Sequence, residues 1–409
     1  MGDEFLNLKE PYEAKNILNS LKLKKTVEMV DIRNCLGRVL ADDIYSSIAL
    51  PPFDRVAMDG YAVLAKDTFG ASEDNPKALK LIEVIGAGDK PQKNIVDGTC
   101  TEVGTGAPAP QKADAVVMVE YTEKSGDDIL IYQGVAPGEN ITKKGTDIEE
   151  NNLLLKKDTV LTPDKIGVLS AIGMATIPVY VQTKVGIIST GNELVTVGED
   201  IDYGKVYDVN SQSITSAVLS CGCIPISIQI VSDNFEALKN AINSLIDDAD
   251  IIITSGGTSA GAGDILRPVI EDMGKVLVHG ISFKPGKPTL IGIIEGDENK
   301  ILIGLPGYPV SALMVFESLI APFLRRTSGW KAVVSGPISV PLKISRRFHS
   351  SRGRTHQLLV KVQDGLAVPI QKDSGAIAAL AHADGYLEIP KSTEIIEEGT
   401  IVEVKLFQR

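Results

Sequence analysis

The sequence contains little cysteine and little histidine, and this scarcity limits the metal and disulfide chemistry open to it. Of 409 residues, four are cysteine and four are histidine. No two cysteines form a Cys-x-x-Cys pair, so the sequence suggests neither a zinc site nor a disulfide framework. The histidines are scattered along the chain, and we interpret them as structural or surface residues.

Long hydrophobic runs are also missing. The longest uncharged apolar run, residues 166–181, is shorter than a membrane span and contains glycine and proline. The acidic N-terminus MGDEFLNLKE has no secretory hydrophobic region, and Leu6 stands where a myristoylation signal has serine or threonine. We therefore expect a cytoplasmic protein with no membrane partner.

The chain has fewer basic residues than acidic ones, 41 against 53, which gives a formal net charge of -12. Such an acidic protein is a poor general binder of nucleic acid, because it is repelled by phosphate backbones. One basic segment is the exception: no acidic residue lies between Glu317 and Asp364, where nine lysines and arginines occur. It lacks the aromatic platform that stacks nucleic-acid bases. The segment is either a patch that guides a small anion to a site or a solvated surface.

The length of the chain predicts several domains, roughly two to four. Strand and helix patterns alternate over residues 182–327, which predicts a three-layer α/β/α domain with a mostly parallel sheet. Short strands with glycine turns predict a small antiparallel β domain inserted at 49–147 and a C-terminal β domain at 331–409. Residues 1–48 and 148–181 would then form a discontinuous domain of helices and strands. The predicted fold class is multidomain α/β plus β.

The stretch DIIITSGGTSAGAGD, residues 250–264, has an unusual composition. Its apolar β-forming residues predict a buried strand, and the glycine turn that follows can bring backbone N–H groups close to a ligand. A helix predicted from Ile265 would direct its N-terminal amides to the same place, which suits an anion. A plain strand-to-helix turn, with Asp264 as a capping residue, explains the stretch equally well.

Three further loops follow predicted strands of the α/β segment: STGNEL, FKPGKP and GLPGYPVS. In open α/β sheets ligands bind beyond the carboxyl ends of the strands, so these loops can converge on one crevice. Lys284 and Lys287 flank a stiff Pro-Gly pair, and their ammonium groups would bind an oxyanion. Mg²⁺ prefers hard oxygen ligands and binds carboxylates together with substrate phosphates. Carboxylates of this kind are supplied here by Glu193, Asp233 and Asp264. Each carboxylate taken alone could equally be a cap or a surface charge.

Taken together and in order, seven motifs resemble those of the molybdopterin molybdenumtransferase family, also called MoeA, which includes the E domain of gephyrin. The motifs are PPFDRVAMDGYAV, TGAP, the loop of residues 143–147, STGNEL, SGGTSAGAGD, FKPGKP and GLPGYPVSA. The resemblance covers essentially the whole chain. It implies an enzyme that inserts molybdate into adenylylated molybdopterin with Mg²⁺ and releases AMP. It also implies an elongated homodimer of four-domain subunits, dimerising through the discontinuous domain, with each site shared between the subunits.

Site residues carried over by motif fall into three groups. As catalytic residues the resemblance implies Asp59, Asp147 and Asp264, and as metal ligands Glu193, Asp233 and Asp264. The residues implied to bind substrate are Thr105, Gly256, Gly257, Thr258, Ser259, Lys284, Lys287, Pro288, Ser311, Arg354 and Ser374.

Two departures from the family pattern affect the site. The family often has asparagine where this sequence has Tyr308. It often reads Arg-Thr-Glu-Phe where this sequence reads Arg354-Thr355-His356-Gln357, so that Arg352 is an alternative oxyanion ligand.

Two other functions remain open from the sequence. One is a molybdopterin adenylyltransferase, because the α/β domain resembles that of the enzyme that makes the adenylylated pterin. The other is a non-catalytic scaffold of the gephyrin kind. The sequence does not discriminate molybdate from tungstate, because these oxyanions have similar shape and charge.

Overall fold

The structure is a computed structural model that describes residues 8–258, 264–296, 298–330 and 337–407. The chain divides into two compact units. The smaller unit contains residues 42–157 and 163–175, and the larger unit contains the rest. No helix in the described ranges is long and apolar enough to cross a membrane.

A six-stranded mixed sheet is the centre of the larger unit. Its strands lie in the order β16-β13-β17-β21-β20-β18. The first four strands are parallel, and the last two pairings are antiparallel. The bounds are β13 (Lys184–Thr190), β16 (Ile224–Val231), β17 (Ile251–Ser255), β18 (Gly274–His279), β20 (Leu290–Ile294) and β21 (Lys300–Leu305).

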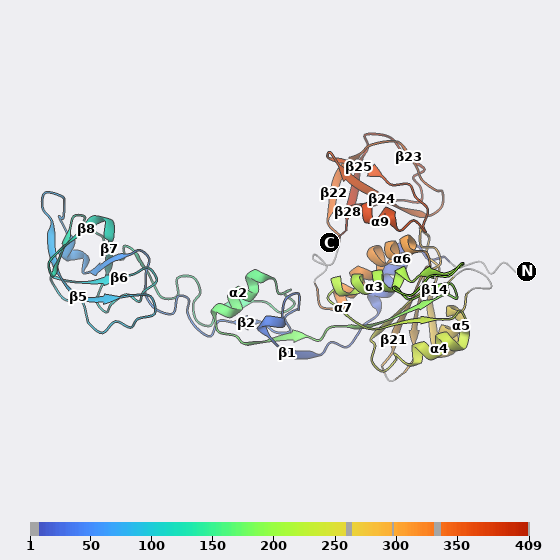
Figure 1. The fold of residues 1–409 in the computed structure, drawn as a ribbon, viewed down its shortest axis with the longest axis horizontal. Helices are drawn as coiled ribbons and strands as arrows, with labels where there is room; N and C mark the ends of the chain where they lie inside the picture. The colour runs from blue at the N-terminus through green and yellow to red at the C-terminus, as the bar shows by residue number, and fades with distance from the viewer. Residues whose placement is uncertain (1–7, 259–263, 297, 331–336, 408–409) are drawn as a thin grey trace, which may run out of the picture. The chain divides into compact units, whose positions relative to one another are not determined.

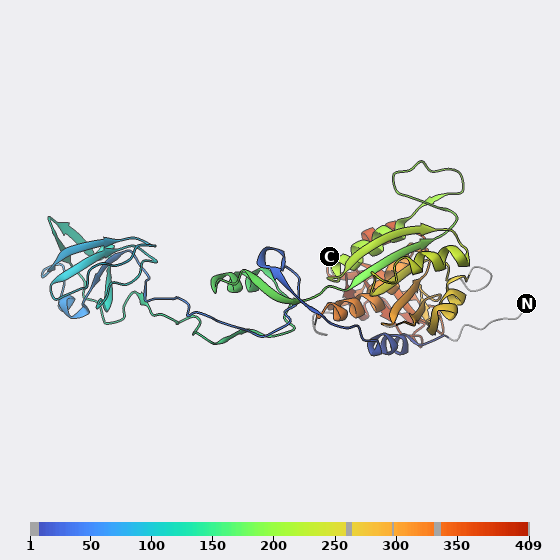
Figure 2. The same ribbon diagram turned by 90° about the horizontal axis from the view of Figure 1, so that it is seen from below.

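Helices cover both faces of this sheet and give it three layers (Figures 1 and 2). One face packs against α1, α3, α6 and α7, and the other against α4 and α5. Strand β17 is buried along its whole length, as its continuous run of apolar β-formers predicts. The helices are α1 (Pro11–Ser20), α3 (Val209–Ser220), α4 (Phe235–Asn243), α5 (Leu266–Met273), α6 (Pro309–Val315) and α7 (Ala321–Thr327), with a π-helical turn at Phe316–Ile320 between the last two.

The C-terminal segment of the larger unit forms a small closed barrel. Its strands pair in the order β24-β25-β22-β28-β26, and β26 pairs back to β24. The short strand β19 (Phe283–Lys284), from a loop of the α/β region, pairs in parallel with β24. Alternate residues of the barrel strands fill its core, including Leu358, Val360 and Leu387. The remaining elements are β22 (Ser339–Ile344), β23 (Phe348–His349), β24 (Thr355–Gln363), β25 (Leu366–Pro369), α9 (Ala378–His382), β26 (Gly385–Ile389), β27 (Ile395–Ile396) and β28 (Ile401–Leu406).

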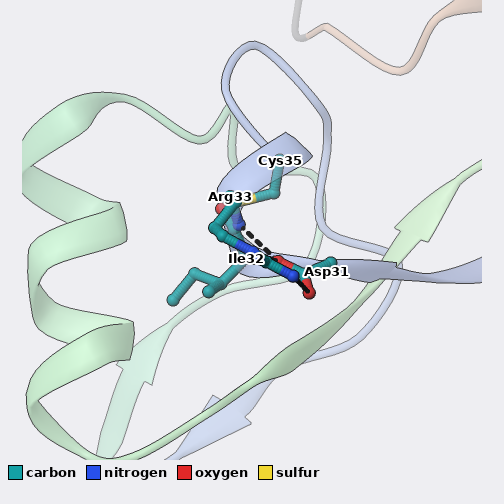
Figure 3. A network of polar contacts seen from close by, with 4 residues as sticks. All are labelled: Asp31, Ile32, Arg33 and Cys35. Carbon is teal, nitrogen blue, oxygen red and sulfur yellow. Dashed lines mark hydrogen bonds and ion pairs between the residues drawn. The ribbon is translucent and has the colours of Figure 1, made fainter.

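A two-stranded ribbon in the larger unit joins β1 (Val27–Asp31) to β12 (Thr176–Tyr180). Strand β1 ends in a 3₁₀ turn, Ile32–Asn34, whose first N–H groups are partly satisfied by Asp31 (Figure 3). The Asp31 carboxylate accepts from the Arg33 backbone at 2.9 Å and from the Arg33 guanidinium at 2.8 Å. These hydrogen bonds hold the pKa of Asp31 well below its usual range.

The smaller unit is built on a six-stranded sheet of order β7-β4-β6-β5-β9-β8. All pairings are antiparallel except β5–β6, which is parallel. The expectation of an antiparallel domain is therefore wrong at this pair, because residues 86–98 return the chain to the same end of the sheet. The bounds are β2 (Ile44–Tyr45), β3 (Arg55–Val56), β4 (Gly60–Val63), β5 (Lys77–Ile85), β6 (Thr99–Val103), β7 (Ala115–Met118), β8 (Thr122–Ser125), β9 (Asp128–Ile131), β10 (Ile141–Thr142), β11 (Leu153–Leu155) and α2 (Pro163–Ala171).

Candidate functional site

Four loops of the larger unit meet at one edge of the α/β sheet. Strands β13, β17 and β21 are parallel and end together. Strand β18 also ends there, because β18 and β21 are both antiparallel to β20. The convergence expected from the loop sequences is confirmed, and the candidate site lies at this edge.

The glycine turn after β17 needs glycine for steric reasons. Gly256 and Gly257 have φ values of 94° and 65°, in the left-handed region. A Cβ on Gly256 would lie 2.4 Å from the backbone oxygen of Thr190. The close approach of the two chain segments, together with the small side chains of the turn, shapes one wall of a cavity.

We call this cavity the glycine-loop pocket. Its volume is about 740 Å³. Its lining includes Thr190, Glu193, Asn210, Asp233, Gly256, Gly257, Thr258, Pro288, Tyr308 and Gly375. Ser259, which was also predicted to bind substrate, lies outside the described residues.

Two buried polar side chains in the glycine-loop pocket were not identified from the sequence as site residues. The Asn210 amide donates to Ser255 Oγ at 2.8 Å and to the Gly307 carbonyl at 2.7 Å. Its Oδ1 atom and the Thr190 hydroxyl are buried without a described hydrogen-bond partner. Asparagine is a common N-cap residue, but the helix α3 is capped by Asp208, whose carboxylate accepts from the Ser211 N–H. Asn210 therefore turns its side chain toward the loops.

The three carboxylates predicted to bind metal are not gathered in one place. Glu193 and Asp233 both line the glycine-loop pocket, and both are exposed. Asp264 is not among the described residues that line it. Its carboxylate lies 3.2 Å from His279 Nε2 and accepts from the Arg267 N–H at 3.2 Å, near the start of α5.

Within the described ranges, no three acidic, histidine or cysteine side chains form a metal cluster. Glu193 and Asp233 fit a Mg²⁺ ion that takes one or two carboxylates from the protein and its remaining oxygen ligands from substrate phosphates and water.

A second cavity, which we call the lysine pocket, lies between the α/β region and the barrel and has a volume of about 730 Å³. Four of the described residues that line it are cationic and one is acidic. The lining includes Lys284, Lys287, Pro288, Ser311, Arg354, His356, Gln357, Lys372, Asp373 and Ser374. The structure thus brings together six of the residues that the family resemblance implies to bind substrate: Lys284, Lys287, Pro288, Ser311, Arg354 and Ser374.

Backbone pairing holds the lysine loop in place. Lys284 of β19 lies opposite His356 of β24, which brings Arg354 close to the loop. The Lys287 carbonyl accepts from the N–H groups of Ile281 and Thr289, each at 2.9 Å. The two ammonium groups are therefore carried on a fixed backbone, with no hydrogen bond or ion pair to the described residues.

The electrostatics of the lysine pocket are visible in His356. Burial, together with the nearby charges of Lys284 and Arg354, lowers the pKa of His356 to about 4. The imidazole is therefore neutral at neutral pH, and its Nδ1 lies 3.2 Å from the Ser350 hydroxyl. Arg352, the alternative oxyanion ligand, is instead exposed and paired with Glu394 at 2.7 Å. This geometry favours Arg354.

The two cavities adjoin. Pro288 lines both, and Ser374 of the lysine pocket is followed by Gly375 of the glycine-loop pocket. The Ser374 carbonyl also accepts from the Val310 N–H at the start of α6, which fixes this segment beside Ser311. A ligand with an anionic group in one pocket could contact an oxyanion in the other.

The remaining predicted site residues belong to the smaller unit. Asp59 Oδ1 accepts from the Thr105 backbone N–H at 2.6 Å and from its hydroxyl at 2.7 Å. Chiefly through the hydroxyl contact, Thr105 lowers the pKa of Asp59. Asp147 lines a cavity of about 620 Å³ within this unit, together with Arg55 and Thr146.

Three family descriptions match successive parts of the chain. Residues 9–173 match the MoeA N-terminal region (domains I and II), residues 186–326 a probable molybdopterin binding domain, and residues 341–407 the MoeA C-terminal region (domain IV).

Two relatives and one solved structure are similar to nearly the whole chain. A putative molybdopterin biosynthesis protein of Methanocaldococcus jannaschii is 37% identical over 393 residues, covering 94% of this chain and 93% of its own. The molybdopterin molybdenumtransferase of Bacillus subtilis is 32% identical, covering 93% and 90%. A crystal structure of a molybdopterin biosynthesis MoeA protein from Pyrococcus horikosii matches with a TM-score of 0.86 at 40% identity, over 98% of this chain and 100% of that one.

Proposed function

Since the chain belongs to the molybdopterin molybdenumtransferase (MoeA) family, which acts in the last step of molybdenum cofactor biosynthesis, we propose that it transfers molybdenum from molybdate into adenylylated molybdopterin and releases AMP. The observation that carries this proposal is the lysine pocket, which adjoins a glycine-lined cavity at a sheet edge. An oxyanion and a nucleotide can be held next to each other there.

Molybdate is the substrate assigned to the lysine pocket. Lys284, Lys287 and Arg354 donate charge-assisted hydrogen bonds to its oxygens, which are stronger than neutral ones. Ser311 and Ser374 line the same cavity and can donate from their hydroxyls. Lys284 lies on the paired strand β19 and the Lys287 carbonyl accepts two backbone hydrogen bonds, so the backbone that carries these two ammonium groups is already in place for the oxyanion.

The adenylylated pterin is assigned to the glycine-loop pocket. Gly257 and Thr258 line the cavity, and their backbone N–H groups can approach phosphate oxygens. The buried oxygens of Asn210 and Thr190 offer hydrogen bonds to a polar ring or sugar. Mg²⁺ held by Glu193 and Asp233 would neutralise charge on the phosphoanhydride between pterin and AMP. Positioning and charge neutralisation carry most of the catalysis, and no side-chain nucleophile is required.

The resemblance that names the family also implies a homodimer with a shared site. We propose that this chain dimerises, that it acts in the cytoplasm, and that Asp59, Thr105 and Asp147 serve the reaction. Tungstate is an alternative substrate for the same pocket. Light scattering at micromolar concentration tests the dimer: a fully active monomer would rule it out.

The test of the oxyanion assignment is a molybdate titration of cofactor formation with Lys287→Ala. Charge-assisted hydrogen bonds contribute roughly 1.5–3 kcal/mol each, so the half-saturating molybdate concentration should rise roughly ten- to a hundredfold. Lys275→Ala, on the exposed part of β18, is the matched control and should leave the curve unchanged. If Lys287→Ala weakens nucleotide binding and not molybdate binding, Lys287 is a phosphate ligand and the assignment is wrong.

The identity of the released product separates the insertion step from adenylyl transfer. Release of AMP from adenylylated molybdopterin on addition of molybdate supports the transferase. Release of pyrophosphate from ATP and molybdopterin would identify an adenylyltransferase. If both activities were absent while the protein bound the nucleotide, a scaffold role would replace the proposal.

A further inference from the structure

Gln357 is a buried side chain of the lysine pocket whose polar atoms have no partner among the described residues. It lies on β24, three residues after Arg354, and only 2% of it is exposed. It lines the cavity beside Lys284 and Ser311. Both its Oε1 and Nε2 atoms are buried without a hydrogen bond to any residue in the described ranges. Buried amides are nearly always paired, so this one requires an explanation.

The surrounding contacts show that the fold does not need an amide at this position. The cross-strand neighbour of Gln357 on β26 is Glu388, and the Glu388 carboxylate already accepts from Lys405. Leu359, which shares a face of β24 with Gln357, packs in an apolar cluster with Val310 and Met314 of α6. An apolar side chain of similar volume would suit the environment and would remove the cost of an unpaired buried amide.

We propose that Gln357 is a further ligand of the oxyanion in the lysine pocket, donating from Nε2 to an oxygen of a tetrahedral dianion. This inference rests on the proposed function of the pocket. The amide is not accessible in the present conformation, so the side chain turns toward the cavity when the oxyanion binds. No hydrogen bond to a described residue opposes that turn.

A neutral donor complements the charges already present. The pocket has cations at Lys284, Lys287 and Arg354, and the imidazole of His356 next to Gln357 is neutral at neutral pH. An amide adds a directed hydrogen bond without adding repulsion between like charges. A carboxylate at the same position would repel a dianion across a short distance.

The experiment compares Gln357→Leu and Gln357→Glu with the wild-type chain, using sodium molybdate as the probe. Calorimetry gives the molybdate affinity and thermal unfolding gives the stability without molybdate. Gln357→Leu should weaken molybdate about three- to tenfold, the range for a neutral hydrogen bond, while its Tm stays the same or rises. Gln357→Glu keeps the shape and should weaken molybdate more than Gln357→Leu does. Gln363→Leu, at the exposed end of β24, is the matched control and should change neither quantity.

Each outcome decides the inference. If Gln357→Leu lowers Tm and leaves the molybdate affinity unchanged, the amide is structural and the inference fails. If Gln357→Leu destabilises the fold, the isosteric Gln357→Glu decides, because unchanged molybdate affinity there also overturns the inference. If Lys287→Ala weakens molybdate while neither Gln357 variant does, only this inference fails. If Lys287→Ala also has no effect, the proposed oxyanion pocket itself is wrong.

Discussion

The lysine pocket and the glycine-loop pocket adjoin at Pro288, but different parts of the chain give them their properties. In the lysine pocket, long charged side chains are brought together by pairing between β19 and β24. In the glycine-loop pocket, the close approach of the Gly256 and Thr190 backbones shapes one wall, and Glu193 and Asp233 stand exposed at the lining. One pocket gathers the cations that we propose to bind an oxyanion, whereas the other has a sterically defined glycine wall and two of the three carboxylates that we expected to bind metal.

This difference determines how each pocket should respond to change. A wall made by close backbone approach depends on the absence of side-chain atoms, so a single added methyl group can disrupt it. A pocket made by charge loses affinity in steps as each cation is removed. The predictions below test that contrast, beginning with the largest expected effect.

Adding a methyl group to the glycine turn should have the largest effect. In Gly256→Ala the new Cβ would lie 2.4 Å from the Thr190 oxygen, at a residue with φ 94°. We expect the free energy of unfolding to fall by about 3 kcal/mol or more, from overpacking and backbone strain together. Denaturant unfolding measures it.

The control for Gly256→Ala is Gly198→Ala. Gly198 has a similar φ of 98°, but a methyl group added there would meet nothing within 4 Å, so strain acts without a clash. A smaller loss, about 1–2 kcal/mol, is expected. Equal losses in the two variants would mean that the close approach to Thr190 does not constrain the turn.

Removal of the Asp264 charge should reduce catalysis and leave the fold intact. If this carboxylate serves the metal or phosphate, Asp264→Asn should lower AMP release by about a hundredfold or more. Asparagine keeps an acceptor for the Arg267 N–H, so Tm should change little.

The companion variant for Asp264 is His279→Gln, which removes the imidazole 3.2 Å from the carboxylate. Normal turnover by Asp264→Asn at saturating Mg²⁺, with an equal loss of Tm in both variants, would identify a structural pair and remove Asp264 from the site.

Two arginines two positions apart give the next test. Arg354 lines the lysine pocket, so Arg354→Ala should weaken molybdate roughly ten- to a hundredfold in a binding titration. Arg352 forms an exposed ion pair with Glu394, and such pairs contribute at most about 1 kcal/mol. Arg352→Ala should therefore leave molybdate affinity within about twofold of wild type. The reverse order of effects would restore Arg352 as the oxyanion ligand.

The smallest expected effect is a pH dependence of stability from His356. The unfolded chain binds a proton at this histidine below about pH 6.5, whereas the folded chain does so only near pH 4. The contribution of His356 to stability is therefore full above pH 6.5 and is lost as the pH falls from 6.5 to 4. His356→Gln should flatten the curve of the free energy of unfolding against pH in this window, by on the order of 1 kcal/mol after solvent screening, as measured by denaturant unfolding at each pH.

The control for His356→Gln is His382→Gln, which changes an exposed histidine of α9. Its curve should follow that of the wild type. If His356→Gln and wild type lose the same stability between pH 6.5 and 4, neither burial nor the cations of the lysine pocket lowers the pKa of His356 as described.

Much of the larger unit could be predicted from local sequence patterns. The apolar run before Gly256 forms the buried strand β17, as expected. The charged loop at Lys284 and Lys287 also lines a cavity, as expected. These features are local, because strand and helix periodicity, glycine turns and proline-stiffened loops depend on neighbouring residues.

Local patterns were insufficient where one residue type serves two purposes. Asn210 and Asp208 are both good N-caps, and the structure uses Asp208 for α3 and turns Asn210 toward Ser255. Asp264, expected to cap a helix from Ile265, accepts from the Arg267 N–H in a helix that begins at Leu266 and also contacts His279. Which role each side chain takes depends on which partner the fold brings within hydrogen-bond distance.

By itself the sequence determined the α/β and β character of the chain, the four loops and the cationic residues that we propose to bind an oxyanion. Tertiary structure alone decided that Arg354, and not Arg352, lines the lysine pocket, and that Gln357 is buried there without a partner among the described residues. It also decided the low pKa of His356. The physical reason is that β19 pairs with a strand far along the chain, so the burial and charge of each side chain are set by residues that no local pattern connects.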